Sequence, residues 1–134
     1  MAEFVLDARL AADTAFVADW PLSRVLLMND ARFPWLVLVP RRAGAVEIFD
    51  LSAPERCEFF DEIACAGERL KELSGAAKIN IGALGNIVPQ LHMHVVARNP
   101  SDAAWPGPVW GQGKAAPYAA TAMADFIRRL AAGL

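Results

Sequence analysis

The chain of 134 residues is 55% hydrophobic and 21% charged, which predicts a single domain over residues 1–134 and excludes an intrinsically disordered chain. Its formal net charge is −2, with acidic and basic residues interspersed, and this excludes the positive field that holds a nucleic acid polymer. Because the chain lacks a signal-peptide pattern and any run of about 18 apolar residues, we expect a cytoplasmic protein that does not bind membranes.

Three short segments in the N-terminal part of the chain predict strands. Residues 14–18 form the first, which should end at Trp20 because the following proline cannot donate to a β-ladder. Residues 25–28 and 36–39 are runs of branched aliphatic side chains separated by a segment rich in turn residues. These two runs predict an antiparallel hairpin.

A helix is predicted over residues 52–73. Ser52 can serve as the N-cap, and Pro54 and Glu55 complete the pattern of a capping box, while Gly75 can end the helix. Apolar side chains recur at spacings of four and three and form one stripe, which should pack on the sheet. The stripe consists of Phe59, Ile63, Ala66, Leu70 and Leu73.

The chain contains two cysteines, Cys57 and Cys65, and both fall on this predicted helix. At 1.5 Å per residue they would lie about 12 Å apart, which is too far for a disulfide. We therefore expect two reduced thiols that are buried in the core.

The second half of the chain predicts two more strands and a second helix. Residues 77–81 and 90–97 alternate between polar and apolar side chains, and the glycine-containing segment 82–89 should join them as a loop. Residues 118–130 carry apolar side chains at helical spacing, so a C-terminal helix is expected over about 117–131, with Gly133 just beyond it. Together these elements predict an α+β fold, in which one main helix packs on an antiparallel sheet of about five strands and the C-terminal helix flanks it.

Residues 99–117 are too rich in proline and glycine for regular structure, yet they contain Trp105 and Trp110. A segment with such large aromatic side chains is expected to pack against the rest of the molecule rather than to form a solvated linker. Arg98 precedes this segment at the end of a strand. We interpret it as a solvated edge residue and not as a phosphate ligand.

His92 and His94 are the two histidines of the chain, and their spacing places them on one face of a strand together with Gln90. Three interpretations of this polar row remain open. The row can face solvent on an exposed side of the sheet. It can bind a metal, although such sites usually need a third ligand and the chain has no other histidine. Alternatively, a neutral imidazole can attack phosphorus as a nucleophile.

The sequence Gln-Leu-His-Met-His-Val-Val at residues 90–96 resembles the motif of the histidine triad (HIT) family, His-φ-His-φ-His-φ-φ, with Gln90 at the first histidine. Residues 27–41 are similar to the ribose-binding strands of that family, and residues 80–86 resemble its phosphate-side loop. The resemblance covers about residues 4–110. It implies the HIT-like fold and a homodimer with a continuous sheet across its interface.

The resemblance also implies roles for individual residues. His92 would be the nucleophile and would form a covalent nucleotidyl-histidine, while His94 would contact the α-phosphate or the leaving group. Asn80 and Asn86 would donate hydrogen bonds around the phosphates, and Asn29 would hold the ribose hydroxyls. The Trp residues at the C-terminal side would either cover the sheet or lie near the active site of a partner subunit.

Gln90 joins His94 among the implied catalytic and nucleotide-binding residues. Its backbone carbonyl can fix the tautomer of His92, but its side chain cannot act as a general acid. The implied function is hydrolysis or transfer at the α-phosphate of a dinucleoside polyphosphate, such as diadenosine tetraphosphate, or of a nucleoside phosphoramidate, with no cofactor and no metal. The alternatives are a non-catalytic nucleotide-binding regulatory protein and, in a different class, a metal-binding protein that uses the two histidines.

Overall fold

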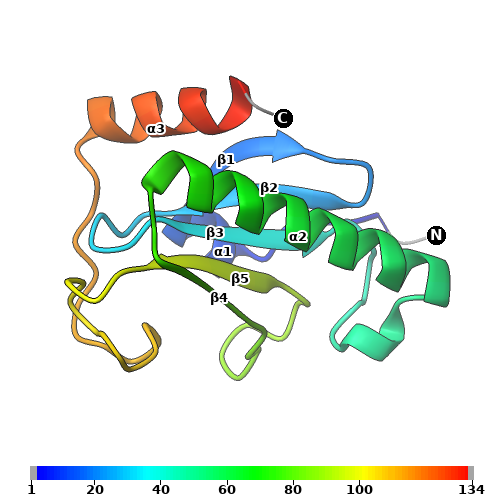
Figure 1. The fold of residues 1–134 in the computed structure, drawn as a ribbon. Helices are drawn as coiled ribbons and strands as arrows, with labels where there is room; N and C mark the ends of the chain where they lie inside the picture. The colour runs from blue at the N-terminus through cyan, green and yellow to red at the C-terminus, as the bar shows by residue number, and fades with distance from the viewer. Residues whose placement is uncertain (1–2, 133–134) are drawn as a thin grey trace.

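The five predicted strands form one antiparallel sheet in the computed structural model, which describes residues 3–132 (Figure 1). Across the sheet the strand order is β1-β2-β3-β5-β4. The strands are β1 (Thr14–Asp19), β2 (Ser23–Met28), β3 (Trp35–Pro40), β4 (Lys78–Gly82) and β5 (Met93–Arg98). The helices are α1 (Ala8–Asp13), α2 (Ala53–Ser74) and α3 (Ala120–Ala132), with a 3-10 turn, η1 (Ile48–Asp50), before α2. The predicted α+β fold is confirmed.

Most predicted elements lie where their local signals placed them. The hairpin is β2–β3, with Leu26 opposite Val37, and α3 begins at Ala120, three residues later than expected. The strand predicted from Gln90 onward begins only at Met93 because the backbone N–H of Leu91 donates to Ala45 rather than to a neighbouring strand. Helix α1 was not predicted. Gly133 lies outside the described residues.

Helix α2 has the termini that its sequence predicts. The Ser52 side chain accepts from the backbone of Glu55, and the Glu55 side chain accepts from the backbone of Ser52, so the capping box is complete. At the other end Gly75 adopts φ = 68°, a left-handed conformation that glycine adopts without steric cost. Four members of the predicted stripe are buried against the sheet, and Leu73 is partly buried.

The expectation that the cysteines are buried is wrong, because Cys57 and Cys65 are both exposed. Each is separated by two residues from a member of the buried stripe, Phe59 or Ile63. Two residues turn a helix by about 200°, so both thiols lie on the side of α2 that faces away from the sheet.

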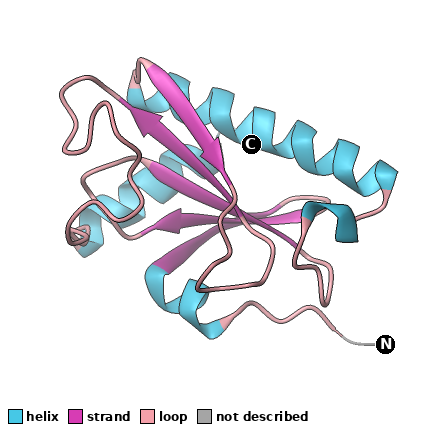
Figure 2. Ribbon diagram, turned by 90° about the horizontal axis from the view of Figure 1, so that it is seen from below, coloured by secondary structure: helices cyan, strands magenta, loops and turns pink. Residues whose placement is uncertain are grey.

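Both faces of the sheet are covered, as Figures 1 and 2 show. Helices α2 and α3 lie on one face, over a core that includes Val25, Leu38 and Val95. Helix α1 and the segment 99–117 lie on the other face, over a second core that includes Val37 and Val96. Alternate residues of each strand therefore enter different cores, and this explains why all residues of β3 and β5 are buried.

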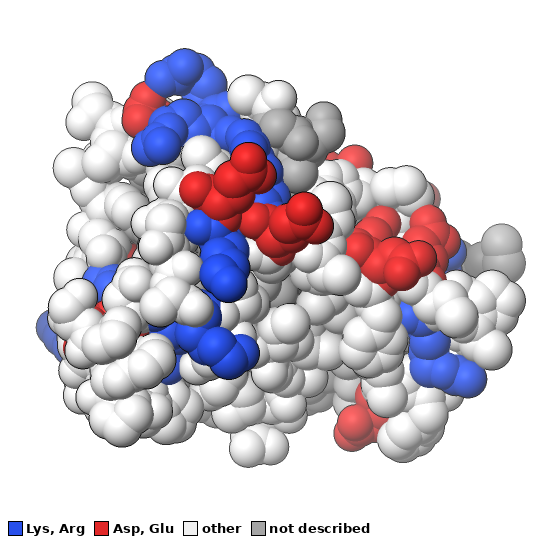
Figure 3. Space-filling view, viewed as in Figure 1, with Lys and Arg blue, Asp and Glu red and all other residues white. Residues whose placement is uncertain are grey.

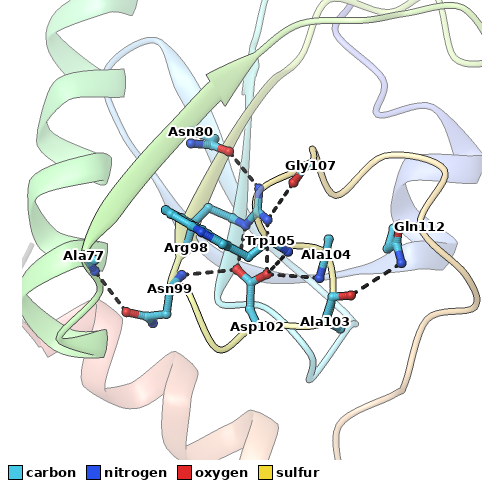
Figure 4. Close-up of polar contacts among 10 residues, drawn as sticks. All are labelled: Ala77, Asn80, Arg98, Asn99, Asp102, Ala103, Ala104, Trp105, Gly107 and Gln112. Carbon is cyan, nitrogen blue, oxygen red and sulfur yellow. Dashed lines mark hydrogen bonds and ion pairs between the residues drawn. The ribbon is translucent and has the colours of Figure 1, made fainter.

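The interpretation of Arg98 as a solvated edge residue is also wrong, because its side chain is only 1% exposed. Its guanidinium donates twice to Asp102, from Nε at 2.7 Å and from Nη2 at 3.1 Å, and also to Asn80 and to the carbonyl of Gly107 (Figure 4). The Trp105 ring lies beside this guanidinium. Arg98 therefore fastens the start of the segment 99–117 to the sheet, and the pKa of Asp102 lies well below its usual range because of these hydrogen bonds from Arg98.

Acidic and basic side chains are intermixed on the face that α2 and α3 cover, and broad uncharged areas separate them (Figure 3). This face therefore has no field of a single sign, as the composition predicted. Within residues 3–132, none of the helices combines the length and the apolar character that crossing a membrane requires.

Candidate active site

A pocket with a volume of about 670 Å³ opens on the face of the sheet that α1 and the segment 99–117 cover. Both histidines line it. The other walls come from α1, from the ends of β2 and β3, from the loop after β4 and from the segment that follows Arg98. Lining residues outside the motif include Leu10, Asp13, Met28, Asn29, Asp30, Arg32, Trp35, Gly85, Asn86, Val109, Trp110 and Gln112.

His92 is 6% exposed, and a backbone atom orients its ring. Its Nδ1 lies 2.6 Å from the carbonyl oxygen of Gln90. A carbonyl can only accept a hydrogen bond, so Nδ1 carries the proton and Nε2 of the neutral ring has a free electron pair. This is the tautomer that a nitrogen nucleophile requires.

His94 is held in the opposite way. The indole Nε1–H of Trp35 donates to His94 Nδ1 at 3.0 Å, and the ring of His94 lies 4.9 Å from that of His92, centroid to centroid. Burial, together with the neighbouring His92, lowers the pKa of His94 from 6.5 to about 3. His94 is therefore neutral at physiological pH, with its proton on Nε2.

The surroundings of the two histidines bear on the interpretations of the polar row. Each histidine is buried, with only 6% of its surface exposed, so these two residues do not face bulk solvent. Within the part of the chain that the structure describes, no three His, Cys, Asp or Glu residues group together as metal ligands would. In their neutral forms the two rings place an acceptor nitrogen, Nε2 of His92, beside the N–H donor of His94.

The side chain of Gln90 does not reach the large pocket. Its Oε1 accepts from the backbone N–H of Asp7 at 2.8 Å, and its Nε2 donates to the carbonyl of Val5 at 2.8 Å. Gln90 therefore ties the segment before α1 to the motif. Of the atoms of Gln90 that were expected in the site, only the backbone carbonyl oxygen lies against His92.

The three predicted asparagines lie in different places. Asn29 and Asn86 both line the pocket, and the Oδ1 of Asn29 accepts from the backbone of Tyr118, so its amide NH₂ is the group left to contact a ligand. Asn80 does not line the pocket, and its Oδ1 accepts from Arg98 at 2.8 Å. The structure thus brings two of the three together with the histidines.

Several pocket residues were not predicted from the sequence. Asp30 is 2% exposed and pairs with Arg32 through contacts of 2.8 and 3.0 Å. Burial opposes ionisation of Asp30, but hydrogen bonds from Arg32 and from the backbone of Ala116 outweigh it and lower the pKa. Arg32 also donates to the carbonyl of Gln112, so the pair fastens the segment 99–117 across the pocket. The turn composition of residues 29–34 was the only sequence signal at this position.

Trp110 and Trp105 have separate roles. The ring of Trp110 lies 5.4 Å from that of His94, centroid to centroid, and it lines the pocket of its own chain. A Cβ atom on Gly82 would lie 3.0 Å from Trp110, so this glycine makes room for the ring. Trp105 lies over Arg98 instead. The predicted packing of this segment is confirmed.

Comparison with known proteins found a matching family model and similar solved structures. The family model of the HIT domain matches residues 9–101. The structure is similar to that of a histidine triad protein from Bradyrhizobium japonicum, with 47% identity, 96% of each chain covered and a TM-score of 0.94. A histidine triad protein from Sinorhizobium meliloti 1021 matches at 46% identity and a TM-score of 0.95, over 98% of this chain and 97% of that one.

A histidine triad protein from Marinobacter aquaeolei VT8 is similar at 43% identity and a TM-score of 0.94, over 96% of this chain and 94% of that one. Among curated proteins, none matches the chain. The likeness to the three solved structures extends over nearly the full length, so it includes α3 and the segment 99–117 as well as the part that the family model matches.

Proposed function

The chain belongs to the HIT family, and from this membership we propose that it is a nucleotide hydrolase or transferase that attacks the α-phosphate of its substrate with His92. Proteins of this family are generally nucleotide hydrolases or transferases. The observation that carries the proposal is the contact of 2.6 Å between His92 Nδ1 and the Gln90 carbonyl. In the neutral ring this contact leaves Nε2 unprotonated at the wall of the pocket.

In the proposed reaction the electron pair of His92 Nε2 attacks phosphorus. A bond between nitrogen and phosphorus forms, and the bond to the leaving group breaks with its electrons on that group. Water or another acceptor then attacks the same phosphorus and loses its proton to solvent, and the nitrogen–phosphorus bond breaks with its electrons on Nε2 of His92. The imidazole is positively charged while it carries the nucleotide, and the Gln90 carbonyl stabilises this charge by accepting a hydrogen bond from Nδ1–H.

The pocket residues supply the contacts that the substrate needs in this proposal. His94 donates its Nε2–H to a phosphoryl oxygen, and Asn86 lies on the same loop as Gly85, at the phosphate side. The free amide of Asn29 contacts the ribose. Asn80, which was expected at the phosphates, would instead act indirectly, because it holds Arg98.

We place dinucleoside polyphosphates first among the substrates because of the leaving group. His94 has a pKa of about 3, lowered mainly by burial, so it does not protonate a leaving group near neutral pH. A nucleotide leaves as a stable anion without a proton, whereas the amine of a phosphoramidate needs one. The charged lining residues are Asp13, Asp30 and Arg32, and Arg32 is paired, so the outer phosphates should extend toward solvent.

The test is to incubate the protein with diadenosine tetraphosphate and with an adenosine phosphoramidate, with and without a chelator. The nucleotide products are quantified, and mass spectrometry looks for an adenylyl group on the protein. We expect turnover that a chelator does not change and that His92→Ala abolishes, with the adenylyl group on His92. Thermal unfolding of His92→Ala verifies that the variant is folded.

A second candidate is a non-catalytic nucleotide-binding protein, and the position of Gln90 favours it. Its side chain forms hydrogen bonds with the backbone of Val5 and Asp7, so the residue at the first motif position contributes no proton donor to the pocket. This candidate predicts that wild type and His92→Ala bind adenosine monophosphate equally and that neither turns over either substrate. Turnover that depends on His92 rules it out.

We also propose that two copies pair through β4, which forms one edge of the sheet. Ile81 on this strand is 51% exposed, and such an edge can add a strand from a second molecule. Sedimentation at several protein concentrations tests this proposal. A monomer at all concentrations would contradict it.

A further inference from the structure

Trp35 is a large buried side chain whose one polar atom, the indole Nε1, forms a hydrogen bond with His94. Trp35 is 7% exposed and His94 is 6% exposed, and the indole Nε1–H donates to His94 Nδ1 at 3.0 Å. Val37, two residues after Trp35 on β3, is the register partner of His94. Trp35 therefore reaches His94 diagonally on the same face of the sheet.

The chemistry of the indole makes this contact decisive. An indole N–H can donate but cannot accept, so it is compatible only with an unprotonated Nδ1 on His94. A backbone carbonyl or a water molecule at this place would permit the other tautomer. Because the indole N–H of Trp35 permits only the tautomer with an unprotonated Nδ1, the proton of the neutral His94 ring must reside on Nε2.

The neighbouring histidine shows why this tautomer matters. His92 carries its proton on Nδ1 because it donates to the Gln90 carbonyl, so its Nε2 is an acceptor. The two rings, 4.9 Å apart, thus have opposite tautomers. If His94 also had an unprotonated Nε2, two nitrogen electron pairs would face the anionic oxygens of a phosphate, and no donor would stabilise the charge that develops there.

We propose that Trp35 is a positioning residue that holds His94 in its Nε2–H tautomer, so that a neutral N–H donor stands beside the attacking nitrogen of His92. The inference rests on the proposed reaction at His92. The burial of His94 between Trp35 and Trp110 supports this inference. Burial lowers the pKa of His94, so the ring does not gain a second proton and become a donor at both nitrogens.

The first experiment needs no substrate. Long-range ¹H–¹⁵N NMR of the ligand-free wild type, labelled in histidine, reports which ring nitrogen of each histidine carries the proton. We expect Nε2–H for His94 near neutral pH and Nδ1–H for the neutral ring of His92. A wild-type His94 that is protonated on Nδ1 would overturn the inference, whatever the activity of the protein.

The variant Trp35→Phe removes the donor and retains an aromatic ring. We expect the His94 signals to move toward Nδ1–H and kcat to fall by about 10- to 100-fold with a smaller change in KM, since one transition-state donor is weakened rather than deleted. The matched control is Trp110→Phe, which alters another ring against His94. Its indole N–H has no partner among the described residues, so we expect the His94 tautomer to be unchanged.

These results separate the inference from the function on which it rests. If NMR shows the expected tautomers but the protein does not turn over either substrate, the proposed reaction is wrong. The role of Trp35 in setting the tautomer of His94 would still stand. Turnover in a protein whose Trp35→Phe variant retains the Nε2–H tautomer would overturn the inference alone. A thermal unfolding curve establishes that each variant is folded before its NMR spectrum is interpreted.

Discussion

Replacing Asp102 with asparagine tests the buried ion pair that fastens the segment 99–117. Arg98 is 1% exposed and donates two hydrogen bonds to Asp102, which also accepts from three backbone N–H groups of its own turn. Asp102→Asn removes the negative charge and turns an amide NH₂ toward the guanidinium. Breaking one side of a buried pair costs about 3–5 kcal/mol, and we expect the lower end because one acceptor oxygen remains.

The assay is urea unfolding at neutral pH, and Asp125→Asn is the matched control. Asp125 pairs with Arg128 on α3, but both side chains are more than half exposed, so the control should cost less than about 1 kcal/mol. Because the pKa of Asp102 is lowered in the folded protein, its contribution is present above the unfolded pKa of about 3.9 and is lost as the pH falls below it. The deficit of Asp102→Asn should therefore narrow in acid. An equal loss in both variants would refute this reasoning.

Three further predictions concern the site. Burial lowers the pKa of His94 from 6.5 to about 3, so its contribution to stability is fully present above pH 6.5 and is lost as the pH falls toward 3. Between pH 7 and 5 the free energy of unfolding should therefore fall by about 2 kcal/mol more in wild type than in His94→Gln. Urea unfolding curves that respond equally to pH in the two proteins would contradict this. Gly82→Ala places a Cβ about 3.0 Å from Trp110 and should weaken binding of adenosine monophosphate about tenfold by calorimetry; unchanged affinity would mean that the ring gives way. Gln90→Ala removes two hydrogen bonds to the backbone before α1, so amide exchange in residues 3–13 should accelerate, and unchanged exchange would show that other contacts hold this segment.

Local signals were enough for most of the fold. The capping box at Ser52 and the glycine at position 75 placed α2, because the groups that satisfy the helix termini are close in sequence. Helix α1 has six residues, which is too short for hydrophobic periodicity, and its N-cap Asp7 is by itself a weak signal. The cysteines were misplaced although the helical period, applied from Phe59 and Ile63, places them on the outer side.

The site was predictable where the motif is local and was not where partners come from elsewhere. His92 and its carbonyl partner are two residues apart, so the pattern at 90–94 indicated the orientation of the ring. The donor to His94 is 59 residues away on another strand, and only the sheet register brings it there. Arg98 was misjudged for a related reason, because the acceptors that make its burial possible lie on β4 and in an irregular turn.

The exchange of histidine for Gln90 can be judged from what each atom of that residue contacts. The atom that serves His92 is a backbone carbonyl, which every amino acid supplies, so the substitution does not remove the tautomer that a nucleophile needs. The side chain instead forms two hydrogen bonds with the segment before α1: its Oε1 accepts from the backbone N–H of Asp7, and its Nε2 donates to the carbonyl of Val5. A single imidazole cannot form both of these hydrogen bonds in the same geometry. The side chain at position 90 therefore attaches the segment before α1 to the motif, and in the proposed reaction this position supplies no general acid. In the proposed reaction the nucleophile depends on the chain path between residues 90 and 92, because that path places the Gln90 carbonyl against His92 Nδ1. A substitution at position 90 that keeps this path should therefore leave the tautomer of His92 unchanged and loosen only the segment before α1.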